Sequence, residues 1–168
     1  MTAQPETAER AVLDHLEALG VADFEVVRID PAFANTAEFC ARYGYDMRTS
    51  VNCIVVATKT GQRRHAACCV QATRRLDVNA TVRRRLGVRK ASFAPAEETV
   101  ALTGMAPDGV TPFGLPDGLP VWVDAEIMTL DRIIVGGGSR SLKLEVAPAD
   151  LLRVPDAEVV AGLARDPS

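Results

Sequence analysis

This sequence lacks both a targeting segment and a long apolar run. The first residues, MTAQPETAER, contain neither a basic start nor an apolar stretch, and no later segment is long enough to span a bilayer. Hydrophobic residues still make up 48% of the chain and charged residues 24%, which is typical of a folded protein with a packed core. We therefore expect a cytoplasmic protein with no membrane partner. Its 168 residues favour a single domain, residues 1–168.

Metal-binding and redox motifs are also missing. No CxxC pair and no zinc-ligand spacing is found among the four cysteines and two histidines, which are Cys40, Cys53, Cys68, Cys69, His15 and His65. Because free cysteine packs as a small hydrophobe, we expect buried thiols, no bound metal and no cofactor. A weaker alternative is a catalytic thiol at Cys53 or Cys68 that uses His65 as its base.

Basic residues are unevenly distributed along the chain. The net charge of -3 and the pI near 5.4 argue against a general nucleic-acid binder. Residues 63–90, however, carry nine basic side chains against the single acid Asp77, a net charge of +8, whereas the rest of the chain carries -11. This segment is either a solvated face or, as we favour, a contact surface for a nucleic-acid backbone.

Hydrophobic periodicity predicts short helices among the strands. The first half of the chain predicts a helix over 6–19, a strand over 24–29, a helix from Thr36 to Gly44, and a hairpin of residues 51–57 and 64–70.

The second half predicts two further helices. Asn79 can cap a helix that Gly87 closes, and Pro95 can start another that Gly104 closes. Three further strands follow, at 120–124, 132–135 and 141–146. Such a mixture predicts an α+β domain with a mixed, barrel-like β-sheet and packed short helices.

Four segments carry a family resemblance: VNCIVVATKTGQ, RRRLGVRKASFAPAEETVALTG, DGVTPFGLPDGLPVWVD and VGGGSRSLKLEVAPADLL. With these segments, residues 34–162 resemble the YbaK/prolyl-tRNA synthetase-associated family of aminoacyl-tRNA editing domains. The third segment is the most specific, since its helix end, GVTPFGL turn and apolar strand seldom occur together.

The resemblance implies an aminoacyl-tRNA deacylase, a hydrolase that serves translation fidelity by cleaving, in trans, the ester of mischarged aminoacyl-tRNA. Aminoacyl-tRNA is the implied partner. The sequence leaves open whether a synthetase partner is required, which amino acid is removed, and the oligomeric state. The alternative is a catalytically weak or silent member that binds tRNA or a nucleotide.

The resemblance also assigns candidate site residues. Ester hydrolysis needs a placed water and donors for the developing oxyanion, and glycine lets backbone amides approach the substrate closely. The matching loop places Gly109 and Asp108 at the catalytic centre, together with Asn52. The substrate-binding candidates are Val110, Thr111, Pro112, Phe113, Gly114, Gly137, Gly138, Ser139 and Arg140. The tRNA-binding candidates are Arg83, Arg84, Arg85, Arg89 and Lys90.

Two of these positions depart from the family pattern. Asn52 stands where the family has a lysine, and an amide can donate hydrogen bonds but supplies no charge. The substitute cations open to the chain are Lys59, Lys143 and Arg48. Asp108 replaces the leading glycine, and its carboxylate opposes an oxyanion unless the register shifts toward Gly109.

Two further features each have two interpretations. The run Gly136, Gly137 and Gly138 is either a hairpin connection or a close approach to the terminal adenosine. Asp124 either caps the turn that follows its strand or belongs to the site.

Overall fold

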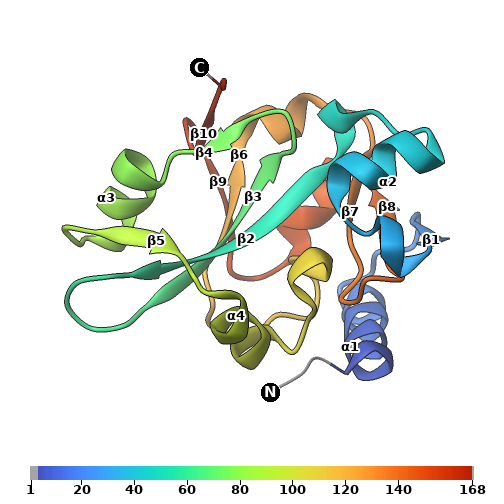
Figure 1. Cartoon of the computed structure of the whole chain (residues 1–168), viewed down its shortest axis with the longest axis horizontal. Coiled ribbons are helices and arrows are strands. Elements are labelled where there is room, and N and C mark those ends of the chain that lie inside the picture. The colour runs from blue at the N-terminus through green and yellow to red at the C-terminus, as the bar shows by residue number, and fades with distance from the viewer. Residues whose placement is uncertain (1–3, 168) are drawn as a thin grey trace.

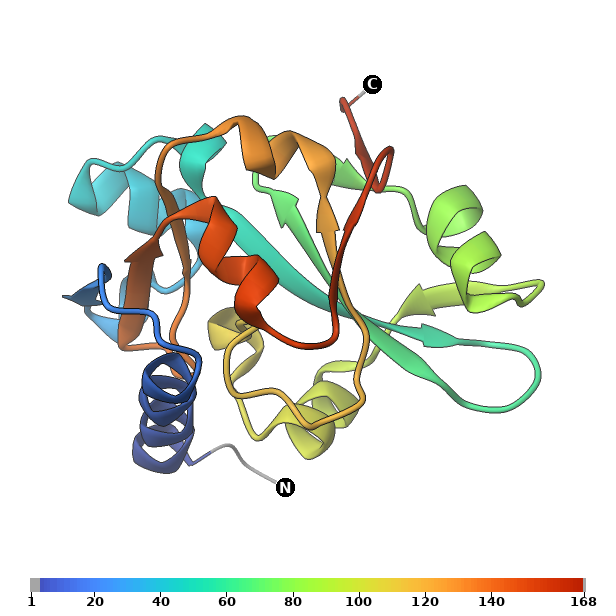
Figure 2. The same ribbon diagram turned by 180° about the vertical axis from the view of Figure 1, so that it is seen from behind.

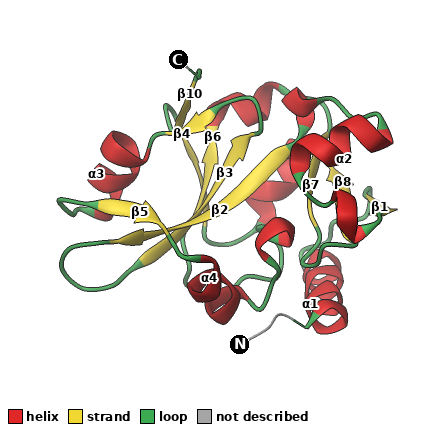
Figure 3. Cartoon of the chain, in the orientation of Figure 1, coloured by secondary structure: helices red, strands yellow, loops and turns green. Residues whose placement is uncertain are grey.

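The structure, a computed structural model, describes residues 4–167 and combines short helices with ten strands in that range (Figure 3). The α-helices are α1 (Pro5–Ala18), α2 (Thr36–Tyr43), α3 (Arg83–Leu86) and α4 (Ala96–Thr103). The first five strands are β1 (Glu25–Arg28), β2 (Val51–Thr58), β3 (His65–Gln71), β4 (Arg75–Leu76) and β5 (Ala91–Phe93). The others are β6 (Val121–Asp124), β7 (Ile133–Gly136), β8 (Leu142–Val146), β9 (Ala157–Val160) and β10 (Ala164–Arg165).

The strands form three sheets. The largest has the order β5-β2-β3-β6-β9, the second β1-β8-β7, and the third pairs β10 with β4. The predicted hairpin is confirmed, because β2 and β3 pair antiparallel, whereas β3 pairs parallel with β6. The two larger sheets adjoin through one bridge between Ser50 and Ile134. The α+β class is therefore confirmed, with a mixed sheet that stays open, since within residues 4–167 the strands do not close into a barrel.

The main hydrophobic core lies between α1 and the two larger sheets. The apolar stripe of α1 is buried as its spacing predicts, with Val12 and Leu16 fully enclosed. They belong to one cluster with Phe113 from the long loop and Leu144 from β8. Figures 1 and 2 show α1 and α2 at one end of the molecule, and α3 with β5 at the other.

Two helix starts differ from the predicted ones. Asn35, not Thr36, caps α2, and its side-chain oxygen accepts hydrogen bonds from the N–H groups of Ala37 and Glu38. Asp77, not Asn79, caps the segment before α3, and the first turn there is a π-helix. In both places an Asx side chain one or two residues earlier reaches the free N–H groups first.

The helix ends follow the sequence more closely. The predicted stops at Gly44 and Gly104 are confirmed, and both residues adopt the left-handed conformation, with φ of 77° and 72°. Over residues 4–167, no helix has both the length and the apolar character needed to cross a membrane.

Candidate active site

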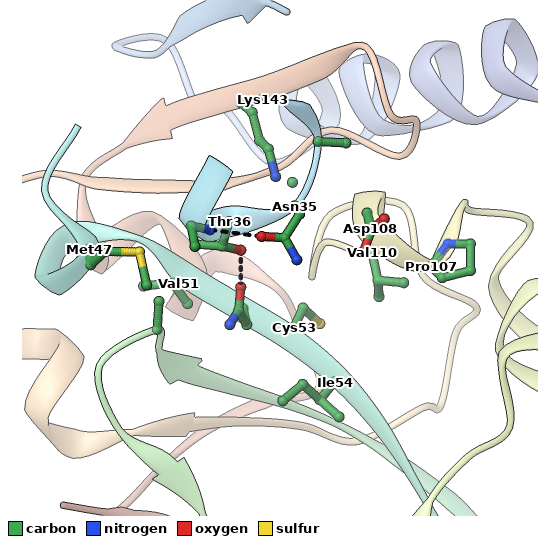
Figure 4. A pocket seen from close by; sticks show the side chains of 15 residues that line it. Asn35, Thr36, Met47, Val51, Cys53, Ile54, Pro107, Asp108, Val110 and Lys143 are labelled. Atoms are coloured by element: carbon green, nitrogen blue, oxygen red, sulfur yellow. Dashed lines mark hydrogen bonds between the residues drawn. The ribbon is translucent and has the colours of Figure 1, made fainter. Parts of the chain in front are cut away.

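A cavity of about 350 Å³ opens where the two larger sheets meet (Figure 4). Its walls come from the start of α2, the first half of β2, the turn Pro107–Gly109, and the facing ends of β7 and β8. Its polar side chains are Asn35, Thr36, Asn52, Asp108 and Lys143. Its apolar wall includes Met47, Val51, Cys53, Ile54 and Val110. A mixed lining of this size suits a small ligand with an apolar part and a polar group.

Asn52 lies in this cavity, as predicted, and is oriented by α2. The Thr36 hydroxyl donates to the Asn52 side-chain oxygen at 2.8 Å (Figure 4). Thr36 is free for this contact because Asn35 caps the helix. With its oxygen engaged, Asn52 keeps the two N–H donors of its amide for a ligand. The helix cap, which the sequence placed one residue too late, therefore decides how Asn52 can act.

Lys143 is the cation of this cavity. It enters from β8, opposite Gly136 of β7, and its side chain points toward Asn35 and Thr36 in Figure 4. The residue is only 7% exposed, and its ammonium lies 5.4 Å from the centre of the Phe39 ring. Within residues 4–167, no carboxylate forms an ion pair with it.

Burial lowers the pKa of Lys143, and the negative charge of Asp108 opposes part of that decrease. Neither of the other two cations considered from the sequence, Lys59 and Arg48, lines the cavity. A partly desolvated ammonium without an ion pair is available to a negatively charged or polarised ligand oxygen.

The turn Pro107–Gly109 contributes Pro107 and Asp108 to the cavity wall. Asp108 lines the cavity and forms an ion pair with Arg140, whose guanidinium also donates to the Pro31 carbonyl at 2.9 Å. The Arg140 charge therefore offsets the carboxylate that the sequence places beside the substrate.

Gly109 supports the turn and does not line the cavity. Its N–H donates to the Ala106 carbonyl at 2.8 Å, and its carbonyl accepts from the Gly138 N–H at 2.7 Å. A Cβ at Gly109 would lie 2.5 Å from the Ser139 carbonyl oxygen, so only glycine fits there. Val110, the next residue, lines the cavity, and in the described part of the chain its N–H has no hydrogen-bond partner.

The glycine run 136–138 makes a close backbone approach to this turn. A Cβ at Gly136 would lie 2.7 Å from the Val110 carbonyl oxygen, and one at Gly137 would lie 2.5 Å from the Leu142 side chain. Of the three, only Gly136 lines the cavity. Ser139 is 1% exposed and donates to a Glu9 carboxylate oxygen at 2.6 Å, so its hydroxyl is already engaged.

The remaining residues of the GVTPFG motif hold the loop in place. Thr111, Pro112 and Phe113 are buried away from the cavity lining, and the Gly114 N–H donates to His15 Nδ1 at 2.6 Å. Asp124 is also structural, because it is 1% exposed and accepts hydrogen bonds from the N–H groups that follow its strand and open β10.

The cysteines do not form a thiol–imidazole pair. Cys53 lines the cavity, but a hydrogen bond with Cys69 and burial raise its pKa, and burial likewise raises the pKa of Cys68. His65 Nε2 lies 2.5 Å from a Glu98 carboxylate oxygen and lines a different hollow. Neutral thiols and an engaged imidazole do not support a cysteine nucleophile.

Part of the basic segment 63–90 is neutralised by acids from outside it. Arg63 pairs with Glu98, and Arg85 pairs with Glu158 while lying 4.9 Å from the centre of the Trp122 ring. Arg83 donates to a backbone carbonyl. Among the described residues, the exposed side chains without an ion pair include Arg84, Arg89 and Lys90. They lie around α3 and β5, at the far end of β2 from the cavity (Figure 1).

This fold and cavity define an α+β domain with a cavity of mixed polar and apolar lining at the junction of two sheets. The family model described as the aminoacyl-tRNA editing domain matches residues 30–154, and the chain belongs to this family. Its function is accordingly aminoacyl-tRNA editing.

Solved structures of similar fold span nearly the whole chain. One, described as a candidate trans-editing enzyme for prolyl tRNA synthetase, has a TM-score of 0.81 at 24% identity and covers 99% of this chain and 100% of its own. A hypothetical protein designated APE2540 has a TM-score of 0.81 at 25% identity, covering 92% and 99%. A scaffold protein used for epitope grafting has a TM-score of 0.79 at 22% identity, covering 95% and 98%.

Proposed function

We propose that residues 1–168 act as one domain that hydrolyses the ester of mischarged aminoacyl-tRNA in trans, with water as the nucleophile. The observation that carries this proposal is the position of Lys143, a buried cation that lines the cavity. The family's lysine is missing at position 52, and the cavity regains a cation from β8. The likeness to a structure described as a candidate trans-editing enzyme for prolyl tRNA synthetase supports action in trans. It also suggests a prolyl tRNA synthetase as the synthetase partner of this chain.

In this mechanism the ester carbonyl lies between Asn52 and the turn that carries Val110. The water oxygen attacks the carbonyl carbon, negative charge develops on the carbonyl oxygen, and the bond to the ribose oxygen breaks. One proton of the water ends on that ribose oxygen, the other passes to solvent, and the amino acid leaves as a carboxylate. The Lys143 ammonium, the Asn52 amide and the free N–H of Val110 stabilise the developing charge, which counts for more in a partly desolvated cavity than in water.

Asp108 and Arg140 form the rim of the site. Their side chains are 41% and 45% exposed, so the pair contributes little to stability. Its role is electrostatic, because Arg140 offsets the Asp108 carboxylate near the oxyanion. The apolar wall, which includes Met47 and Ile54, receives the amino-acid side chain.

A deacylation screen tests the proposal directly. The purified chain is incubated with a panel of tRNAs, each charged with an incorrect amino acid, and loss of the ester is followed against the spontaneous rate. We expect turnover on at least one member, and slower hydrolysis of the correctly charged counterpart. Binding of tRNA without faster hydrolysis of any ester would establish the silent-binder alternative, which Asn52 and Asp108 favour.

The exposed cations around α3 are expected to contact the tRNA backbone. Arg84, Arg89 and Lys90 are exposed and have no ion pair among the described residues, so replacing them by Ala should leave the fold intact. The ion-paired Arg85 is kept. Each lost phosphate contact reduces the slope of log affinity against log salt by about 0.7 to 0.9. We therefore expect weaker binding with a slope flatter by about 2 to 3 units, measured by tRNA binding at several salt concentrations.

Arg10, exposed on α1 at the other end of the molecule, provides the control. The change Arg10→Ala should leave the slope unchanged. Equal salt slopes for the triple variant and the parent would mean that the basic segment is only a solvated face.

A further inference from the structure

Phe93 is an exposed aromatic residue that the active site does not explain. Its exposed fraction is 56%, the highest among the large hydrophobic residues exposed in the described range. It ends β5, which is an edge strand of the five-stranded sheet, and it pairs with Val56 of β2. The exposure of the ring leaves it available to contact a partner.

Phe93 lies where two surface hollows meet. The first, about 290 Å³, is largely apolar and is lined by Ile54 of β2 and Ala94 beside Phe93. It shares Cys53, Ile54, Pro107 and Val110 with the active-site cavity, so the two adjoin. The second hollow, about 400 Å³, is also lined by Phe93, together with residues of β4, β5 and β10.

The second hollow is basic. Arg75 and Arg165 line it, both are exposed, and neither forms an ion pair with any residue of the described range. The nearby acid Asp77 is engaged by Thr81, although its pKa is also lowered by the charge of Arg165. Two unpaired guanidinium groups beside an aromatic ring match the needs of a nucleic-acid strand, which are charge neutralisation and base stacking.

The spacing along β2 fits a short single strand. Val56 lies three residues beyond Cys53, a distance of about 10 Å along a strand. Stacked nucleotides rise by about 3.4 Å each, so two or three of them cover this distance. A tRNA whose terminal adenosine enters the cavity, and whose 3′ strand follows β2, brings the preceding unpaired nucleotides to Phe93.

We propose that Phe93 is a stacking platform for the unpaired 3′ end of tRNA, with Arg75 and Arg165 contacting its phosphates. This rests on the proposed function for the direction of the strand, but it concerns binding and not hydrolysis. The site takes a flexible single strand and requires no particular base, since every base offers a face for stacking.

The test compares uncharged tRNA with the same tRNA lacking its last three nucleotides. Phe93→Ala should weaken binding of the intact tRNA by about 5-fold to 150-fold, the range for loss of one base–aromatic stack. It should leave binding of the trimmed tRNA unchanged. Phe93→Trp, which keeps an aromatic face, should bind intact tRNA as the parent does.

Leu152→Ala, which removes an exposed apolar side chain outside these hollows, is the matched control and should change neither affinity. Unchanged binding of intact tRNA by Phe93→Ala would overturn the platform and leave Phe93 to a protein partner. Equal weakening for both tRNAs would overturn it in favour of a structural role. Because uncharged tRNA is used, these outcomes are independent of whether the chain hydrolyses any ester.

Discussion

Lys143→Met is expected to lower the deacylation rate by about 100-fold to 1000-fold and, at neutral pH, to raise the free energy of unfolding. The loss of rate is the effect of removing one charge-stabilising group from an oxyanion site. The gain in stability follows because a partly desolvated ammonium without an ion pair opposes folding, whereas methionine fills a similar space without that penalty. Single-turnover kinetics and chemical denaturation measure the two effects.

The pH dependence has a defined sign. The folded-state pKa of Lys143 is lowered, so the penalty on folding is complete below that pKa and is relieved as pH rises from it toward the unfolded value of 10.5. Over the same interval activity should fall, because the cation is being lost. Lys143→Met should show neither the rise in stability nor the fall in activity.

Two variants make this prediction specific to the cavity. Lys59→Met removes an exposed lysine outside the cavity and should change neither rate nor stability appreciably. Adding Asn52→Lys to Lys143→Met moves the cation back to the family's position on β2 and should recover much of the rate. A double variant that stays folded but as slow as Lys143→Met would refute the role given to the cation.

Gly136→Ala is expected to reduce both stability and activity strongly. The added methyl would lie 2.7 Å from the Val110 carbonyl oxygen and 2.9 Å from that of Gly109, and both are backbone atoms that cannot rotate away. Overpacking of this kind costs about 1 to 3 kcal/mol of stability. Because the displaced turn carries the Val110 N–H, we expect kcat/KM to fall by about 100-fold.

Gly61→Ala separates crowding from backbone strain. Gly61 lies in the loop between β2 and β3, adopts a φ of 72°, and has no atom near its added Cβ. The Gly61→Ala variant should lose about 1 kcal/mol of stability, because alanine is strained in the left-handed conformation, and it should keep its activity. Thermal unfolding and deacylation kinetics compare the two variants. If Gly136→Ala retained the parent's kcat/KM, the turn would have no part in catalysis.

Local sequence signals predicted most elements, but not four of the strands. The hairpin of β2 and β3 and the helix α4 have clear periodicity or caps. In contrast, β4 and β10 have two residues each, and β5 has three, which is too short for alternation to show. The four-residue strand β9 shows no alternation of buried and exposed residues either. These strands exist because the sheet supplies hydrogen-bond partners, as Val56 does for Phe93, and such partners lie far away in sequence.

The site was also predictable only in part, because some of its contacts join residues that are far apart in sequence. The motif placed Asn52, Asp108 and Val110 in the cavity. Alternation of Leu142, Lys143 and Leu144 predicts that the lysine lies on the opposite face of its strand from the two leucines, but not that it is buried in one cavity with the start of β2. The sequence did not predict that Gly109 supports the turn without lining the cavity. That role depends on a hydrogen bond within the turn and on another to the neighbouring glycine loop.

The bridge between Ser50 and Ile134 joins the two larger sheets beside the cavity. Asn52 belongs to one sheet and Lys143 to the other, and a ligand held by both residues joins the sheets beside this bridge. Its binding free energy is then added to the work of separating the two halves of the molecule. In the proposed site, ligand binding and the contact between the two sheets are thus coupled, so an occupied cavity resists separation of the sheets more than an empty one does.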